Sequence, residues 1–186
     1  MCMPEEDAVP FDAAPPVPAE LGAPTYSLQV SFPGHAGAVT AFLLDLSGHK
    51  QIHPLMVRAE RVSVERLLSN GVTSTQAWTA TEAPRVLGFR RTMTFPARSW
   101  HAAGSNSIAW SASAGFGVYI RHIYDVTDTA AESPESPVVT VHQRTWVSAP
   151  RLLRGYVTSV AKAAHMSQLA RLRKLWEAGG PAKASS

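Results

Sequence analysis

Hydrophobic and polar positions follow two different periods along this chain, and the change of period separates its helices from its strands. Apolar and polar residues alternate from Tyr26 to Phe32, which predicts an opening strand. After Pro33-Gly34, apolar side chains recur with the i, i+3, i+4, i+7 spacing of one helical face, at Val39, Phe42, Leu43 and Leu46. We therefore expect a helix over Ala36 to Leu46, ended by Gly48, and a second short turn over Lys50 to Leu55.

From Met56 onward the period is two, which predicts six further strands. They are expected at residues 56–67, 72–81, 86–95, 107–114, 118–126 and 138–147. Asn70-Gly71 is a strong hairpin signal because both residues tolerate positive φ. Gly104-Ser105-Asn106 and Gly115-Phe116-Gly117 predict two more turns, and a polar loop is expected over Thr127 to Pro137. Seven strands with short connections favour an antiparallel meander in an α+β fold.

A long amphipathic helix is predicted from Arg151 to Glu177, directly after Ala149-Pro150. On a helical wheel its apolar residues share one broad face, and they are Leu153, Val157, Val160, Ala161, Ala164, Leu172 and Leu175. The centre of this face is small, at Ala161 and Ala164. Small residues there either let the helix pack closely on the sheet or leave room for a ligand, and a curved sheet closed by one long helix usually encloses a cavity.

The length of 186 residues is that of a single domain, expected over residues 24–178. Residues 1–23 are rich in Pro, Ala and acidic side chains, and we expect them to be disordered, together with residues 179–186. The single cysteine, Cys2, forms no intramolecular disulfide. No apolar run is long enough to cross a membrane, and the N-terminus lacks the basic start and apolar core of a signal peptide. A cytoplasmic protein, monomeric or homodimeric, is expected.

The formal net charge is +3, and much of the excess lies on the last helix. A nucleic-acid site needs a denser basic stripe with stacking aromatic residues. The helix charges are therefore interpreted as a solvated face, and no nucleic-acid partner is expected.

Motifs of well-known catalytic and cofactor sites are missing from the sequence. There is no phosphate-binding Walker loop and no dinucleotide fingerprint, so no cofactor is expected. The segment SASAG at 111–115 lacks the leading glycine of a nucleophile elbow. His49 and His53 have the four-residue spacing of a zinc site, but the catalytic Glu and a third ligand are missing, and Pro54 limits the helix. We expect a structural role for both, with His53 packed near the cavity mouth, and no metal site.

Alternation along the strands selects the residues that face the long helix. The apolar part of the predicted ligand site is Phe89, Met93, Ile108, Trp110, Ile120, Ala161 and Ala164. Arg91, His122 and Tyr124 share the same inward rows. Polar side chains there need partners, water or a ligand, since their desolvation costs several kcal/mol. An apolar cavity with a few converging polar groups is typical of small-molecule sites.

Some orientations stay open at this point. A bulge near Arg91 would exchange it with Arg90, and His122 and Tyr124 could serve only local hydrogen bonds near the end of the sheet. On the last strand Val139, Val141 and Val147 share one face, which is preferred as the core, and His142, Arg144 and Trp146 share the other. The facing of Trp78 is undecided.

The order of elements resembles the helix-grip fold of the START/Bet v 1-like (SRPBCC) superfamily, most of all its bacterial polyketide cyclase/dehydrase and lipid-transport branch. The segment AVTAFLLDLSGHKQIHPLM at 38–56 is similar to the family's first helix, with Ile52 where a tryptophan is frequent. The segment at 139–177, VTVHQRTWV through RLRKLWE, is similar to its closing strand and helix. The similarity covers about residues 25–177. It implies a seven-stranded curved antiparallel sheet around the long helix, with an apolar cavity between them.

Three functions are compatible with these observations. The first is a non-enzymatic binding or carrier protein for a lipid, polyketide or aromatic metabolite. The second is a polyketide cyclase or aromatase, in which His122 or Tyr124 acts as general acid or base and Arg91 stabilises an enolate oxygen. It ranks lower because the inward rows hold no paired carboxylates. The third is a regulatory module that binds a protein partner through the basic helix face.

Overall fold

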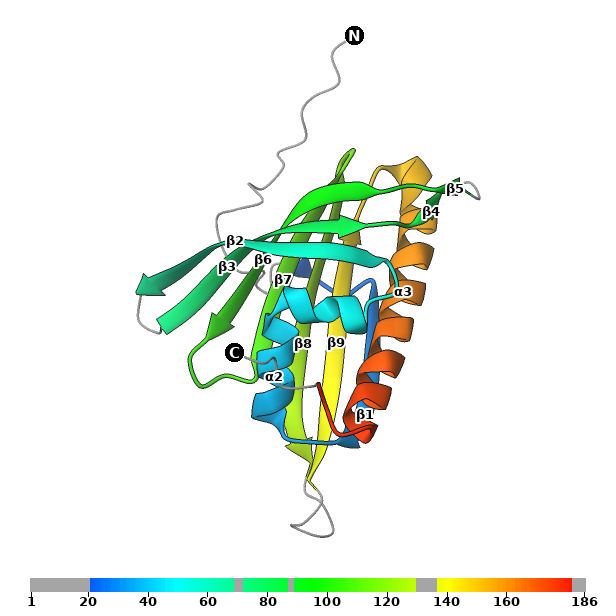
Figure 1. Ribbon diagram of the computed structural model, residues 1–186. Helices are drawn as coiled ribbons and strands as arrows, with labels where there is room; N and C mark the ends of the chain where they lie inside the picture. Colours follow the sequence, from blue (N-terminus) through cyan, green and yellow to red (C-terminus); the bar gives the residue numbers. More distant parts are fainter. Residues whose placement is uncertain (1–20, 69–71, 87–88, 130–136, 182–186) are drawn as a thin grey trace.

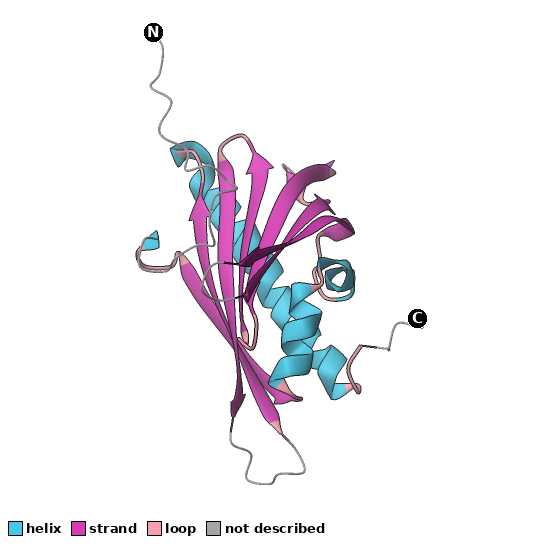
Figure 2. Ribbon diagram, turned by 90° about the vertical axis from the view of Figure 1, so that its left-hand side faces the viewer, coloured by secondary structure: helices cyan, strands magenta, loops and turns pink. Residues whose placement is uncertain are grey.

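The computed structural model describes residues 21–68, 72–86, 89–129 and 137–181, without the side chains of 65–74 and 85–89. It consists of one strongly curved sheet with a long helix, α3, lying along its concave side (Figures 1 and 2). The expected N-terminal tail up to residue 20, most of the expected C-terminal tail and the Asn70-Gly71 turn lie outside the described residues. No helix in the described part of the chain is long and apolar enough to cross a membrane.

Seven antiparallel strands form the main sheet in the order β1-β9-β8-β7-β6-β3-β2. Their bounds are β1 Tyr26–Pro33, β2 Met56–Leu68, β3 Val72–Glu82, β6 Met93–Ala102, β7 Ser107–Gly115, β8 Val118–Thr129 and β9 Val138–Ser148. Consecutive strands from β2 to β9 pair with one another, apart from the small β4–β5 hairpin. The chain crosses once, from β1 at one edge to β2 at the other. The predicted seven-stranded antiparallel sheet with a long closing helix is confirmed.

The helices whose full extent the structure describes are α2 (Ala36–Leu44), the 3-10 helix η1 (Leu46–Gln51) and α3 (Arg151–Glu177). The bounds of α3 are those predicted. The prediction for the first two helices was wrong in detail, since α2 ends before Asp45 and Gly48 lies inside η1 rather than ending a helix. The Asp45 carboxylate accepts a hydrogen bond from the Ser47 backbone N–H at 3.0 Å, which caps η1 and places it four residues earlier than expected.

The prediction of one strand over residues 86–95 was wrong. The structure has a two-residue hairpin there, β4 (Arg85–Val86) with β5 (Phe89–Arg90), and β6 begins only at Met93. The predicted end was also wrong, since β6 continues to Ala102 through Pro96, which donates no ladder hydrogen bond. It is tolerated in β6 because it lies opposite Thr79 of β3, before the pairing with β7 starts at Ala97. Strand β8 also runs to Thr129, three residues into the predicted loop, because it continues to pair with β9.

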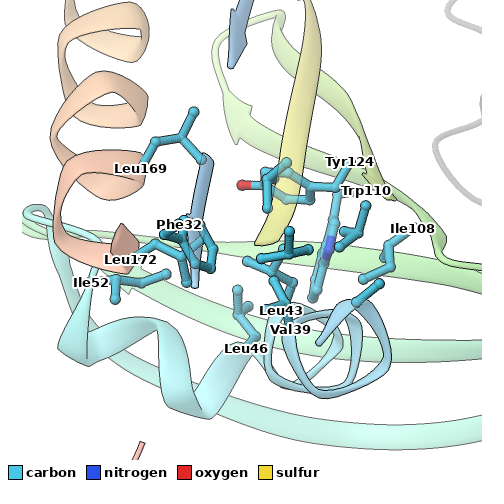
Figure 3. Packing of buried hydrophobic residues seen from close by; sticks show 14 of the residues in the cluster. Phe32, Val39, Leu43, Leu46, Ile52, Ile108, Trp110, Tyr124, Leu169 and Leu172 are labelled. Carbon is cyan, nitrogen blue, oxygen red and sulfur yellow. The ribbon is translucent and has the colours of Figure 1, made fainter. Parts of the chain in front are cut away.

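The hydrophobic core occupies one end of the space between the sheet and α3. There α2 and η1 close the sheet, and the residues gathered between them include Phe32, Val39, Leu43, Ile52, Leu169 and Leu172 (Figure 3). On β9 Val139 and Val141 are buried in this core, as preferred from the sequence. The third residue of that row, Val147, is only partly buried, whereas Trp146 of the other row is buried and donates to the Gly22 carbonyl. Trp78 is also buried and contributes to it. The core thus fills the end of the domain where α3 finishes and leaves the other end to a cavity.

Candidate ligand cavity

A cavity of about 480 Å³ lies between the concave face of the sheet and the first two thirds of α3. Its walls are mainly apolar, and they include Met93, Phe95, Ala97, Trp110, Ile120, Val157, Val160, Ala161 and Ala164. The two alanines are buried and line the cavity. The small residues at the centre of α3 therefore leave room beside the helix rather than letting it pack closely on the sheet.

Eight of the ten residues expected from the sequence line this cavity: Arg91, Met93, Trp110, Ile120, His122, Tyr124, Ala161 and Ala164. Ile108 does not, because it is fully buried in the solid core. It pairs in register with Tyr124, whose longer side chain reaches the cavity from the same level of the sheet. The side chain of Phe89 lies outside the described part. Arg91 is exposed, so it lines the cavity at its open end rather than deep inside.

The inner end of the cavity, which we call the polar floor, is formed by His49, His122, Tyr124, His165 and Gln168. Ring contacts connect its members: the centroids of His122 and Tyr124 are 5.0 Å apart, and those of His122 and His165 are 5.3 Å apart. His53 was expected near the cavity mouth, but it is buried and borders the floor, with its ring centroid 6.1 Å from that of His165. These side chains come from η1, β8 and α3, three segments that are distant in the sequence.

Gln168 fixes the hydrogen-bonding state of two floor residues. Its amide nitrogen lies 3.1 Å from the Tyr124 hydroxyl and 3.5 Å from His49 Nδ1, while His49 Nε2 donates to the Leu43 carbonyl at 3.0 Å. An amide NH2 group only donates, so the Tyr124 oxygen accepts this bond. The hydrogen of the Tyr124 hydroxyl is therefore left for another acceptor.

His165 is held in a similar way by β1 and β9. Its Nδ1 accepts a hydrogen bond from the Gln143 amide nitrogen at 2.9 Å and lies 2.9 Å from the Tyr26 hydroxyl. A neutral imidazole that accepts at Nδ1 carries its hydrogen on Nε2. Together with Tyr124, His165 thus supplies the floor with hydrogen-bond donors suited to an oxygen acceptor.

The floor is polar but uncharged at neutral pH. Burial lowers the pKa of His49 to about 4 and that of His122 to about 3. For His53 and His165 the same desolvation, reinforced by the neighbouring histidines, holds the pKa well below 6.5. Burial also raises the pKa of Tyr124. None of these groups is ionised near pH 7, because a charge in this apolar surrounding would lose its hydration.

A carboxyl group borders the cavity at Glu82, which sequence reasoning missed. Its Oε1 lies 3.7 Å from His53 Nδ1, and burial raises the pKa of the Glu82 carboxyl to about 7. The alternation along the strand contained a signal, because Glu82 lies on the same face as Trp78 and Ala80, which are both buried. The sequence did not decide which way Trp78 faces, so it did not assign this face to the cavity.

His165 and Gln168 were also missed, although their spacing contains the signal. They follow Ala161 by four and seven residues, so they share its helical face. Three buried polar atoms of cavity-lining residues, His53 Nδ1, Trp110 Nε1 and His122 Nδ1, have no hydrogen-bond partner within the described residues. Beside a cavity, such atoms are open to water or to a bound ligand.

The histidines do not form a metal site in the part of the chain that the structure describes, where no three His, Cys, Asp or Glu side chains are placed to hold an ion. Their rings contact one another and the aromatic side chains around them instead. His49, for example, lies with its ring centroid 5.9 Å from that of Trp110 and 6.3 Å from that of Phe42.

No protein-family model matches the sequence, and no curated protein does. Solved structures are similar in fold. The Zhui aromatase/cyclase from a Streptomyces species is 15% identical with a TM-score of 0.61, and the match covers 84% of this chain and 98% of that one. A START superfamily protein from Mycobacterium smegmatis is 13% identical with a TM-score of 0.55, over 82% and 97% of the two chains.

The di-domain aromatase/cyclase StfQ of the steffimycin biosynthetic pathway is 12% identical with a TM-score of 0.56, over 82% of this chain and 46% of that one. At such low identities the matches compare architecture and not chemistry. The curved antiparallel sheet and the long closing helix agree with that architecture. This chain has the helix-grip fold of these aromatase/cyclase and START structures.

Proposed function

We propose that this protein binds a hydrophobic small molecule whose inner end carries an uncharged oxygen acceptor, such as a ketone, phenol or alcohol. The observation that carries the proposal is an apolar cavity ending in a floor of neutral hydrogen-bond donors, Tyr124 and His165. Polyketides, aromatic metabolites and neutral lipids belong to this class. The similarity in fold to aromatase/cyclases and a START protein supports a ligand of this kind.

The neutrality of the floor decides against an acidic head group at that position. A carboxylate or phosphate there would meet no cation, because the histidines around it are uncharged near pH 7. Burying such a charge without a partner is costly. A ketone or hydroxyl oxygen loses less hydration and finds O–H and N–H donors in place of water.

The dimensions of the cavity suit a compact ligand. Its volume of about 480 Å³ lies within the range of roughly 300–1,000 Å³ that is usual for small-molecule sites. Burying about 200 Å² of apolar ligand surface contributes on the order of 5 kcal/mol before the costs of ordering are subtracted. Micromolar affinity corresponds to about 8 kcal/mol, so burial of this area alone does not reach it. The hydrogen bonds of the floor therefore contribute to affinity as well as to orientation and selectivity.

Three naphthalene probes test the proposal by calorimetric titration near pH 7.5. We expect 2-acetylnaphthalene to bind more tightly than naphthalene, and 2-naphthoate to bind weakest. Tyr124→Phe should lower the affinity for the ketone about three- to tenfold, which is the effect of losing one neutral hydrogen bond. It should leave the affinity for naphthalene unchanged. Tyr119→Phe, on the same strand and outside the cavity lining, is the matched control. The proposal is wrong if none of the probes binds or if the carboxylate binds best.

An aromatase- or cyclase-like activity is the second candidate, favoured by the Glu82–His53 pair. A carboxyl with a pKa of about 7 exchanges protons readily at neutral pH. In the simplest such step, Glu82 or His53 takes a proton from the carbon next to the ketone, and the bonding electrons form an enolate. The enolate oxygen would be stabilised by Tyr124 and His165, with His122 beside them.

Deuterium exchange distinguishes a catalyst from a carrier. If the pair is catalytic, the protein should accelerate exchange at the methyl group of bound 2-acetylnaphthalene in D2O, followed by proton NMR. Glu82→Gln should remove the acceleration without abolishing binding, and Glu60→Gln, an exposed carboxylate on β2, should not. If the protein binds the ketone but exchange proceeds at the uncatalysed rate, the Glu82–His53 pair is not catalytic in this reaction. Only the carrier function would then be supported.

A further inference from the structure

Large apolar side chains are exposed around the open end of the cavity. Leu152 is 97% exposed and Phe116 is 89% exposed, while Leu153 and Tyr156 are 41% and 44% exposed. Phe116, Leu153 and Tyr156 also line the cavity, so they surround its opening. They come from the β7–β8 turn and the first two turns of α3, which lie at the same end of the molecule (Figure 1). We call these four residues the apolar rim.

The β7–β8 turn presents Phe116 to solvent rather than folding it over the cavity. Phe116 has a φ of 52° and lies between two glycines with φ of 78° and 70°. Three successive residues in the left-handed region make a tight turn with the aromatic ring at its tip. Large apolar side chains that are exposed to this extent around one opening are typical of interaction sites.

Four arginines accompany the apolar rim, and they are all exposed: Arg90 in β5, Arg91 directly after it, and Arg151 and Arg154 on α3. The described segments that form this end, residues 89–92, 115–118 and 149–158, contain no Asp or Glu. The opening is therefore both apolar and positively charged.

We propose that this end of the protein docks on an anionic lipid bilayer, with Phe116 and Leu152 inserted and the arginines at the level of the lipid head groups. The inference rests on the proposed function, because it supplies the route by which a poorly soluble ligand enters the cavity. Leu152 and Phe116 project separately from two elements, so they fit a deformable lipid surface better than a shaped protein partner. Exposed apolar tips flanked by arginine are what interfacial binding requires, and each arginine near an anionic membrane adds electrostatic attraction.

Vesicle co-sedimentation of the full chain tests this docking. Vesicles of phosphatidylcholine with phosphatidylglycerol should bind the protein, whereas phosphatidylcholine alone should bind it at least tenfold more weakly. Added salt should weaken the binding because it screens the arginines. Leu152→Ser and Phe116→Ser should each reduce the partition coefficient about tenfold, and Arg151→Glu with Arg154→Glu should reduce it further. Val62→Ser is the matched control, since Val62 is 67% exposed on β2 and does not line the cavity.

Failure of docking and failure of ligand binding are separable. Leu152 does not line the cavity, so Leu152→Ser should bind 2-acetylnaphthalene like the wild type and stay folded by circular dichroism. Docking is overturned if anionic vesicles do not bind the wild type, or if Val62→Ser weakens binding as much as Leu152→Ser. It is equally overturned if sedimentation shows that the rim is buried between two copies of the chain, with self-association lost in Leu152→Ser.

Discussion

The two halves of α3 face the same sheet, but one closes a cavity and the other completes a core. In the second half Leu169 and Leu172 are buried against Phe32 and the side chains of α2 and η1. In the first half Val157, Val160 and Ala161 line open space, and the residues before them are exposed. Both halves carry an apolar stripe. What differs is side-chain volume and the presence of α2 and η1, which fill the sheet at one end only.

The polar floor lies at the boundary between these two regions. His165 and Gln168 of α3 follow the small alanines and precede the buried leucines. The sheet holds both of them by hydrogen bonds, through Gln143 and Tyr124. Polar anchoring and the start of dense packing therefore coincide at this boundary. Three predictions test how different the regions are.

Acid should destabilise the protein through the floor, and this is the largest effect expected. Below pH 6.5 histidines of the unfolded chain bind protons, whereas the buried histidines of the folded protein stay neutral. The reason is that burial lowers the pKa of His49 to about 4 and that of His122 to about 3. The free energy of unfolding should fall as the pH drops from about 6.5 to 4, by about 1.4 kcal/mol per pH unit for each such proton. The raised pKa of Glu82 acts in the opposite sense between about 7 and 4.5, but it offsets only one proton.

Urea unfolding at a series of pH values measures this slope. His122→Gln should flatten it, since one buried titrating group is removed, and His142→Gln, on the opposite face of the sheet, should not. A free energy of unfolding that is constant from pH 7 to 4.5 would contradict the neutral, buried state of the floor.

Removing side-chain volume from α3 should lower the free energy of unfolding only at the C-terminal end of the helix. Leu172→Ala should lower the free energy of unfolding by about 2–5 kcal/mol, because Leu172 is fully buried and the cavity left behind has no way to collapse. Leu152→Ala makes the same chemical change on the same helix at a residue that is 97% exposed. It should change the free energy by no more than a few tenths of a kcal/mol. Equal losses in thermal or urea unfolding would mean that the two halves are packed alike.

Adding volume should have the smallest effect on stability and a clear effect on binding. Ala164→Phe places a ring in the cavity, where space exists, so the free energy of unfolding should change by less than about 1 kcal/mol. The affinity for 2-acetylnaphthalene should fall at least tenfold, because the ring occupies the ligand's volume. Ala163→Phe, one residue away and exposed, should leave calorimetric affinity unchanged. Undiminished binding by Ala164→Phe would place the ligand elsewhere.

Periodicity in the sequence determined the order of elements, the bounds of α3, the inward rows of β7 and β8, and the small centre of α3 at Ala161 and Ala164. These features follow from local spacing, since a strand or helix repeats its facing residues at a fixed interval. The sequence misplaced the strand around Pro96 and the start of η1. The strand prediction failed because the β4–β5 hairpin occupies its first half and β6 continues beyond its end. The helix prediction failed because Gly48 lies inside a helix that Asp45 caps.

Only the tertiary structure decided which inward residues line a cavity and which fill a core. Ile108 and Tyr124 share one level of the sheet, yet only the longer side chain reaches the floor. Glu82, His165 and Gln168 acquire their roles from partners on other elements, and the lowered pKa values of the histidines come from burial created by the closing helix. Spacing fixes the direction of a side chain, whereas the volume and polarity around it depend on elements far away in the sequence.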